Sequence, residues 1–345
     1  MSSEQVKPKR NETVDCLKGY ACILVVFGHV ILGIRNAGVN VPCYSIFLEK
    51  FIWSFHMALF FFLSGYVYKI TGEWKSKKSR MKFIVYKAIN LGIPYFVFSA
   101  IYISINSLVP GANHGKDINQ ILLLWKQPVA QYWFLYALFI LFFTWTILSS
   151  VMKNWQILTV LYICGYIVDY IKIDIGVLHY GFSCAFAFGL GTVTKELIAE
   201  KWKVSAKIGI IGAHLIFGVM SIYLGISGKP IIDDIEELIG IVSSIALISL
   251  LCNIKGVNKF LLSVNRYSFP IYLLHTIFTA AVRIALLRLG VKNYFVHVSL
   301  AMLFGMLIPI IVASISERIT ALNVLFYPSK TLRKIQYKIG NEKHE

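Results

Sequence analysis

The stretch DCLKGYACILVVFGHVILGI, residues 15–34, decides the fold. Apart from Asp15, Lys18 and His29, every residue in it is apolar or small. A run of about 20 such residues is long enough to cross the hydrocarbon core of a bilayer as a helix. Similar runs recur along the chain, so the sequence predicts a polytopic membrane protein built only from helices. Its ten predicted spans are 15–34, 48–69, 83–107, 131–150, 155–171, 179–195, 207–228, 236–253, 267–289 and 295–316.

Composition supports the same fold class. Of the 345 residues, 57% are hydrophobic and 15% are charged, whereas soluble domains average roughly 45–50% and about 25%. Lys and Arg number 34 against 17 Asp and Glu, a net charge of +17. Nucleic-acid binding would explain this charge in a soluble protein but not the apolar runs, so we expect no nucleic-acid partner. We expect a single domain over 1–345, with a helical core at about 15–316 and a basic, amphipathic tail at 317–345 on the membrane surface.

The distribution of basic residues predicts the orientation. If the N-terminus is cytoplasmic, 25 of the 34 Lys and Arg fall on the cytoplasmic side, as the positive-inside rule requires. With ten spans, both termini are then cytoplasmic. The first span is expected to be retained and not cleaved as a signal peptide. A short helix is expected near 118–126, in the longest outer loop.

Polar residues inside the spans are the candidates for function, because each is expensive to bury in lipid. The acidic residues fall in loops, tails or span ends, which argues against a carboxylate relay and against a hard-metal site. The four histidines within spans are His29, His56, His214 and His275. None has a metal-binding spacing to another, and we expect His214 to be a packed, hydrogen-bonded side chain. The six cysteines show no CxxC spacing and are expected to be reduced.

Lys18 and His29 lie on one face of the first predicted helix. They are eleven residues apart, which is about 20° beyond three full turns and about 16 Å of rise. Gly19 and Gly28 bracket that face and allow a close approach by a neighbour or a ligand. A snorkelling lysine together with a packed histidine is the alternative interpretation of the pair.

The second predicted span extends the pattern. Because it runs back from the outer side, it brings His56 to a depth similar to that of His29. Ser64 and Gly65 could approach a chain lying between the helices, and Phe60–Phe62 are expected to face lipid. The next inner loop, 69–87, holds seven basic residues. These residues either set the topology and attract anionic lipids, or form a docking surface for a polyanionic cytosolic ligand.

Several blocks of sequence resemble membrane acyltransferase family 3, whose members O-acylate glycans and other cell-surface molecules. The first-helix hallmark of that family, a basic residue followed by ten residues and a histidine, is matched by Lys18 and His29. The chain looks most like the fucose O-acetylase-like branch. Further matching blocks are Ser54–Met57, Phe61–Gly65, Tyr86–Tyr95, Tyr132–Phe139 and Tyr267–His275. Two positions depart from the family pattern. Family members often have arginine at the position of Lys18, and they commonly have a second basic residue of the third helix at the position of Asn90.

The resemblance implies transfer of an acyl group, acetyl or another, from cytosolic acyl-CoA to a hydroxyl of a cell-surface or lipid-linked glycan. We hypothesise that His29 is the general base, because its ordinary pKa suits proton transfer near neutral pH. The remaining roles follow the resemblance. His56 and Ser64 would orient the thioester or acceptor; Lys18, Arg80 and Lys87 would bind the CoA phosphates; Asp15, Tyr132, Trp133, Tyr272 and His275 would support the site or bind the acceptor.

Acyl-CoA is then a substrate, and we expect no permanently bound cofactor and no metal. The expected partners are acyl-CoA, the saccharide acceptor and the lipid bilayer, with a homodimer as one arrangement, in a bacterial plasma membrane. Two alternatives remain open at this point. One is a polysaccharide or lipid-linked glycan exporter or flippase without acyl transfer, and the other is a non-catalytic membrane subunit.

Overall fold

The computed structural model describes residues 11–72, 76–108, 118–172, 176, 178–198, 202–226 and 229–333. Within these ranges the chain forms helices joined by turns and short loops, with no strand, as predicted. The α-helices are α1 (Glu12–Asn36), α2 (Cys43–Trp53), α3 (His56–Thr71), α4 (Lys77–Leu108), α5 (Trp133–Leu148), α6 (Asn154–Ile171), α7 (Leu178–Ser183), α8 (Ala185–Val193), α9 (Val204–Tyr223), α10 (Pro230–Leu251), α11 (Lys255–Arg266), α12 (Ser268–Arg288), α13 (Tyr294–Ser316) and α14 (Thr320–Phe326). Short 3-10 helices cover Ile118–Leu123, where a short helix was predicted, Ala130–Tyr132 and Lys195–Ile198.

Seven segments of the described chain are long and apolar enough to cross a membrane, and α2 with α3 forms one of them. The protein is therefore an all-helical, polytopic membrane protein, but the predicted count of ten spans is not confirmed. Each of the ten predicted spans contains helix, and the three others do not meet the criterion. The apolar part of α6 is short, α7 and α8 are separated by a break at Cys184, and α10 carries four carboxylates at positions 233, 234, 236 and 237.

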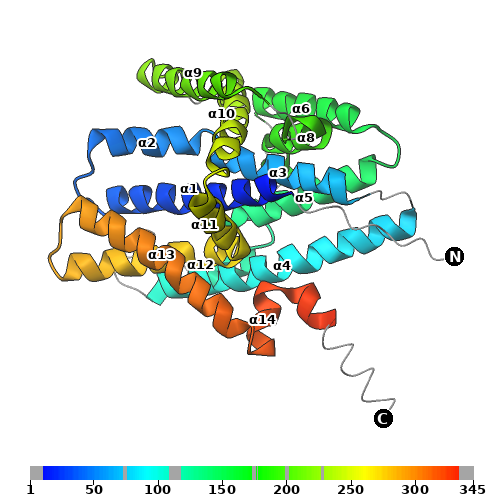
Figure 1. The fold of residues 1–345 in the computed structure, drawn as a ribbon. Helices are drawn as coiled ribbons and strands as arrows, with labels where there is room; N and C mark the ends of the chain where they lie inside the picture. Colours follow the sequence, from blue (N-terminus) through cyan, green and yellow to red (C-terminus); the bar gives the residue numbers. More distant parts are fainter. Residues whose placement is uncertain are drawn as a thin grey trace, which may run out of the picture.

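Helix α1 lies at the centre of the bundle (Figure 1) and packs against α2, α3, α10, α11, α12 and α13. Its buried residues are distributed around its circumference, as expected for a helix enclosed by others. Gly19 allows a close approach by α11, because the backbone carbonyl of Leu261 occupies the place of a β-carbon. The predicted glycine on the Lys18 face is thus used for helix packing.

Helices α3 and α8 are also joined backbone to backbone. The carbonyl of Phe188 lies where Gly65 would carry a β-carbon, and the carbonyl of Phe62 does the same at Gly191. This contact buries the aromatic run of α3: Phe61 is 1% exposed and Phe62 is 0% exposed. The expectation that this run faces lipid is wrong, because the two glycines draw α8 over it.

A break in the second predicted span shapes the centre of the molecule. Helix α2 ends at Trp53 and α3 begins at His56, with Ser54 and Phe55 between them. The break places the rings of Trp53 and His56 with centroids 5.3 Å apart. The start of this span is also fixed to α1, since Arg35 donates two hydrogen bonds, of 2.7 and 3.1 Å, to the buried carboxylate of Glu49.

The C-terminal segment packs back on α4. The side-chain amide of Asn90 donates to Ser329 Oγ at 2.6 Å, and its carbonyl accepts from the Ser329 backbone N–H at 3.3 Å. Phe98 and Phe326 add a ring contact at 5.2 Å. Asn90, which departs from the family pattern, therefore holds the tail in place. Residues 334–345 of the predicted surface tail lie outside the described residues.

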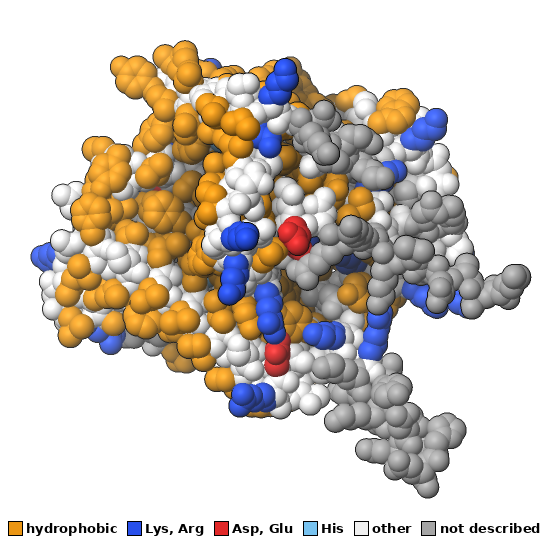
Figure 2. Space-filling model, in the orientation of Figure 1, with side chains coloured by type: hydrophobic (Ala, Val, Ile, Leu, Met, Phe, Trp, Pro, Cys, Tyr) orange, Lys and Arg blue, Asp and Glu red, His pale blue; other side chains and the backbone are white. Residues whose placement is uncertain are grey.

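Charge is distributed unevenly over the surface. On the face in Figure 2, Lys and Arg side chains gather over the half that holds α11 and α14, and hydrophobic side chains cover much of the opposite half. The α11–α14 half is also the end of the bundle where α1 begins, because the thiol of Cys16 contacts the Asn258 side chain of α11 at 3.4 Å. This is the end for which the sequence predicts contact with the cytoplasm, and it is called the inner end below.

Candidate active site

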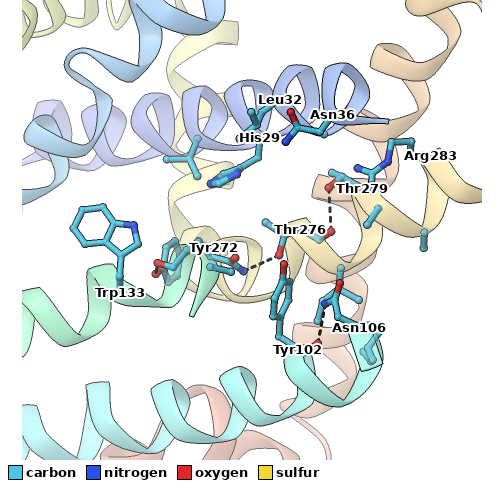
Figure 3. A pocket seen from close by; sticks show the side chains of 18 of the residues that line it. His29, Leu32, Asn36, Tyr102, Asn106, Trp133, Tyr272, Thr276, Thr279 and Arg283 are labelled. Atoms are coloured by element: carbon cyan, nitrogen blue, oxygen red, sulfur yellow. Dashed lines mark hydrogen bonds between the residues drawn. The ribbon is translucent and has the colours of Figure 1, made fainter. Parts of the chain in front are cut away.

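A cavity of about 430 Å³ lies in the opposite half of the bundle, between α1, the α2–α3 break, the end of α4, the start of α5 and α12 (Figure 3). Most of its wall is apolar, with a few polar groups, which is typical of small-molecule sites. The α1 lining residues share one helical face: they are Val25, His29, Leu32, Gly33 and Asn36. Of the predicted site residues, His29, His56, Trp133 and Tyr272 line the cavity.

Three imidazoles and one indole meet beside this cavity. The ring of His29 lies 5.1 Å from that of His275 on α12 and 5.3 Å from that of Trp53, measured between centroids. Trp53 in turn lies 5.3 Å from His56. Gly28 makes room for the indole, because a β-carbon there would lie 3.1 Å from Trp53 Nε1. The fold thus brings together three of the four predicted span histidines.

His214, the fourth, lies elsewhere. Its Nδ1 is 2.6 Å from Ser243 Oγ, and its ring packs against those of Phe51 and Phe55. The side chain is 4% exposed. The prediction of a packed, hydrogen-bonded histidine is confirmed.

The backbone fixes the tautomers of His56 and His275. Nδ1 of His56 lies 2.8 Å from the carbonyl oxygen of Ile52, and Nδ1 of His275 lies 2.9–3.0 Å from the carbonyl oxygens of Ile271 and Tyr272. A carbonyl only accepts, so each Nδ1 must carry a proton and each neutral ring leaves Nε2 as an acceptor. Nε2 of His275 is buried and has no hydrogen-bond partner among the described residues.

His29 differs from both of these histidines. It is partly exposed to the cavity, and no other described residue hydrogen-bonds either of its ring nitrogens. Its tautomer is therefore not fixed by the backbone, and Figure 3 shows its ring directed into the cavity from α1. Of the three, this ring is the one placed to exchange a proton with a bound molecule.

The start of α5 is tied to α12 by two tyrosines. Tyr132 is fully buried, and its hydroxyl donates to the backbone carbonyl of Leu273 at 2.7 Å. In return the Tyr272 hydroxyl donates to the backbone carbonyl of Gln131. Both hydroxyls are thus used in the scaffold, although the ring of Tyr272 forms part of the cavity wall. Trp133, also in the wall, stacks on Tyr180 at 5.8 Å.

The predicted phosphate-binding residues do not line the cavity. Lys18 and Lys87 lie close enough to interact electrostatically, and Lys87 Nζ is 3.8 Å from the centroid of the Phe142 ring. Since α1 is one continuous helix, about 16 Å of rise separates Lys18 from His29. Asp15 and Arg80 also lie outside the cavity.

Ser64, predicted beside the reacting groups, lies outside the cavity as well. It follows His56 by eight residues, which is about 12 Å farther along α3 towards the inner end. The structure therefore does not bring it to the histidine cluster.

Several cavity residues are absent from the sequence prediction, and three of them bear on the chemistry of the site. Trp53 fills the space between His29 and His56. The side-chain amide of Gln131 donates to Thr276 Oγ1 at 2.7 Å, while its side-chain oxygen Oε1 has no partner in the described residues. Arg283 on α12 is 7% exposed. Arg283 could have been identified from the sequence, since it is a charged residue inside a predicted span. The other two become neighbours of the histidines only through contacts between helices.

Among the described residues, no group of three or more His, Cys, Asp or Glu is arranged to hold a metal ion.

Comparison with known proteins gives one match. The model of acyltransferase family 3, described as an acyltransferase domain, matches residues 11–314. No curated protein and no solved structure matches the chain. The matched region runs from the start of α1 almost to the end of α13, so it includes every residue of the cavity wall. The chain belongs to acyltransferase family 3 and is a membrane acyltransferase.

Proposed function

We propose that the protein transfers an acyl group, acetyl in the simplest case, from cytosolic acyl-CoA to a hydroxyl of a cell-surface or lipid-linked glycan in a bacterial plasma membrane. The observation that carries this proposal is the position of His29. Its ring faces the cavity without a hydrogen-bond partner among the described residues, whereas its two neighbours are fixed by backbone carbonyls. Family membership favours acyl transfer over export without chemistry.

In the proposed reaction, His29 accepts the proton of the acceptor hydroxyl as the hydroxyl oxygen attacks the thioester carbonyl. The tetrahedral intermediate collapses with cleavage of the carbon–sulfur bond. The CoA thiolate then takes the proton back from the imidazolium. The products are the O-acyl ester and free CoA thiol, and His29 returns to its neutral form.

His56 acts on the acceptor in this scheme. Because its Nδ1–H is directed to Ile52, a neutral ring offers only an Nε2 lone pair to the cavity. It can accept a hydrogen bond from a sugar hydroxyl but cannot donate one to a thioester carbonyl. A donor for the developing oxyanion must come from elsewhere, and Trp133 offers an indole N–H at the cavity wall.

The donor is bound at the inner end. CoA is a polyanion with a long, thin arm, and Lys18, Lys87 and Arg80 supply positive charge where the chain is predicted to meet the cytoplasm. The rise of about 16 Å along α1 from Lys18 to His29 suits an arm that holds the thioester deep in the bundle. The acceptor enters from the opposite side.

The test compares cells that express the wild-type protein, His29→Ala, His29→Gln and a vector control. Surface and lipid-linked glycans are analysed for acyl groups by mass spectrometry. We expect both substitutions to lower acylation by about 10²- to 10⁴-fold, the usual contribution of a general base. His179→Ala is the matched control, because His179 is exposed on α7 and lies outside the cavity. Wild-type acyl content in the His29 variants, at equal protein level in the membrane, would exclude the proposed role.

A further inference from the structure

The part of the cavity farthest from the inner end contains a buried arginine that the proposed chemistry does not use. Arg283 lines the cavity, is 7% exposed, and its Nε has no hydrogen-bond partner among the described residues. Figure 3 shows its guanidinium group near Asn36 and Thr279, at the opposite end of the cavity from Trp133. Arginine remains charged in proteins, so this group places a positive charge in the wall.

No carboxylate of the described residues forms an ion pair with Arg283, whereas Arg35 is paired with Glu49. An uncompensated charge in a low-dielectric site is destabilising, and buried charges are usually paired. If Arg283 only anchored a helix end, it would be expected to extend into water, as Arg288 does five residues later. Because the described residues supply no counterion for this cavity position, we infer that the counterion arrives with a ligand.

Helix α1 leaves space for this arginine. A β-carbon on Gly33 would lie 2.5 Å from Nη1 of Arg283. Gly33 itself lines the cavity, so a larger residue there would displace the guanidinium group from its present position. The polar side chains of the cavity wall on this side are Tyr102, which interacts electrostatically with Arg283, and Asn36, Asn106 and Thr279. None of them is a carboxylate.

The position of Arg283 relative to His29 suggests which reactant brings the anion. Gly33 follows His29 by four residues, which is about 6 Å along α1 away from the inner end. CoA phosphates are expected at the inner end, about 16 Å in the other direction. An anion at Arg283 is therefore close to the reacting hydroxyl and on the acceptor's side, within the reach of one sugar unit.

We propose that Arg283 and the adjoining cavity wall form an anion subsite for a carboxylate or phosphate carried by the saccharide acceptor. This inference rests on the proposed function, because it assigns the chemical class of that acceptor. The acceptor is then an acidic sugar or a sugar phosphate and not a neutral glycan. Bidentate recognition of either anion is a property of arginine.

The first test measures binding and does not require turnover. Purified full-length protein in nanodiscs is titrated with methyl glucuronide, glucose 6-phosphate and methyl glucoside, and thermal stabilisation is recorded. We expect an anionic sugar to stabilise the protein and the neutral sugar to do so much less. Arg283→Gln should weaken that binding by about 10- to 100-fold. Arg288→Gln removes the same charge from an exposed position on the same helix, and it should change nothing.

The carboxylate and phosphate arms distinguish the two sources of the anion. Equal binding of the three sugars, no binding of either anion, or an unchanged Arg283→Gln variant would each overturn the subsite. If the wild-type protein binds an anionic sugar but acylates no glycan, the proposed function fails while the subsite stands.

The second test identifies the product. In cells with the wild-type protein, the acylated glycan should carry a carboxylate or phosphate on the modified sugar or on its neighbour. Arg283→Gln should lower acylation while Arg283→Lys keeps part of it, and the His29 variants should show the larger loss expected for the general base. A neutral acylated glycan would contradict the inference, and so would a dicarboxylic acyl group on a neutral sugar, since the anion would then belong to the donor.

Discussion

At the scale of single residues, the three histidines of the cavity region are chemically distinct although their rings lie close together. His56 and His275 each direct Nδ1 at backbone carbonyls, so the main chain determines which nitrogen holds the proton. His29 has no such contact within the described chain. One cluster can thus combine a proton acceptor with two neighbours of fixed hydrogen-bonding character, which is how acid–base sites are commonly oriented.

Replacing His56 tests this distinction. Asparagine retains a donor near the Nδ1 position and so keeps the bond to Ile52, but it removes Nε2 from the cavity. We expect His56→Asn to lower acylation by about 10- to 100-fold through loss of acceptor positioning, with unchanged thermal stability. His56→Gln, which returns an acceptor near the Nε2 position, should keep more activity than asparagine. Wild-type acylation by His56→Asn would exclude a role for His56 in positioning the acceptor.

His29 is the residue that the sequence predicts most directly, because an ionisable group inside an apolar run needs an explanation. Lys18 can then be placed on the same helical face as His29, because the two residues are eleven positions apart. Trp53 and Gln131 give no comparable signal, since an indole and an amide near span ends are ordinary, and their importance comes from contacts between helices. Ser64 shows the opposite case: its family block is recognisable in the sequence, but the rise along α3 places it away from the histidines.

At the scale of helices, the contact between α3 and α8 depends on the absence of two side chains. The carbonyls of Phe188 and Phe62 occupy the positions that β-carbons would take at Gly65 and Gly191. In a membrane, such close approach gives helices their association energy through packing.

We expect Gly191→Ala to destabilise the protein by about 1–3 kcal/mol, because the added methyl group meets backbone that cannot rotate away. Thermal unfolding in detergent measures the effect. Gly209→Ala on α9 is the control, since nothing lies within 4 Å of a β-carbon there. This control should be slightly more stable, by about 0.5–1 kcal/mol, from lower backbone entropy in the unfolded chain. Equal melting temperatures for both variants would contradict the packing argument.

The regions that form helix were more predictable than the helix boundaries. Apolar runs place helix in all ten predicted spans, yet the break between α2 and α3 falls inside one of them and α4 begins six residues before its predicted start. Hydropathy cannot locate the break at Ser54 and Phe55, because no Pro or Gly marks it. The burial of Phe61 and Phe62 could not be predicted from hydropathy either, since it depends on the packing of α8 against α3.

At the scale of the whole molecule, the orientation in the membrane determines which end of the cavity meets which substrate. The predicted cytoplasmic end holds Lys18 and Lys87, and the histidine cluster lies in the other half. If the orientation were reversed, the acceptor and donor ends would exchange places. Orientation is therefore the property of the whole chain on which the proposed reaction depends.

Cysteine labelling in intact cells checks the orientation. Cys43, at the start of α2, is exposed, and we expect a membrane-impermeant maleimide to label it from outside. In a Cys43→Ser background, Lys78→Cys at the start of α4 should be labelled only after the membrane is permeabilised. Both sites lie at helix starts, which makes them a matched pair. The reverse pattern would invert the topology and with it the proposed paths of donor and acceptor.

The uninterrupted helix α1 has a consequence for how such a chain can vary. Because one continuous helix contains both Lys18 and His29, the distance and angle between the two side chains depend mainly on the number of residues between them. Inserting one residue would turn His29 by about 100° and direct it away from the cavity. Inserting seven would restore the direction within about 20° but displace the ring by about 10 Å. Between Lys18 and His29, substitutions outside closely packed positions such as Gly19 and Gly28 should therefore be tolerated better than insertions or deletions.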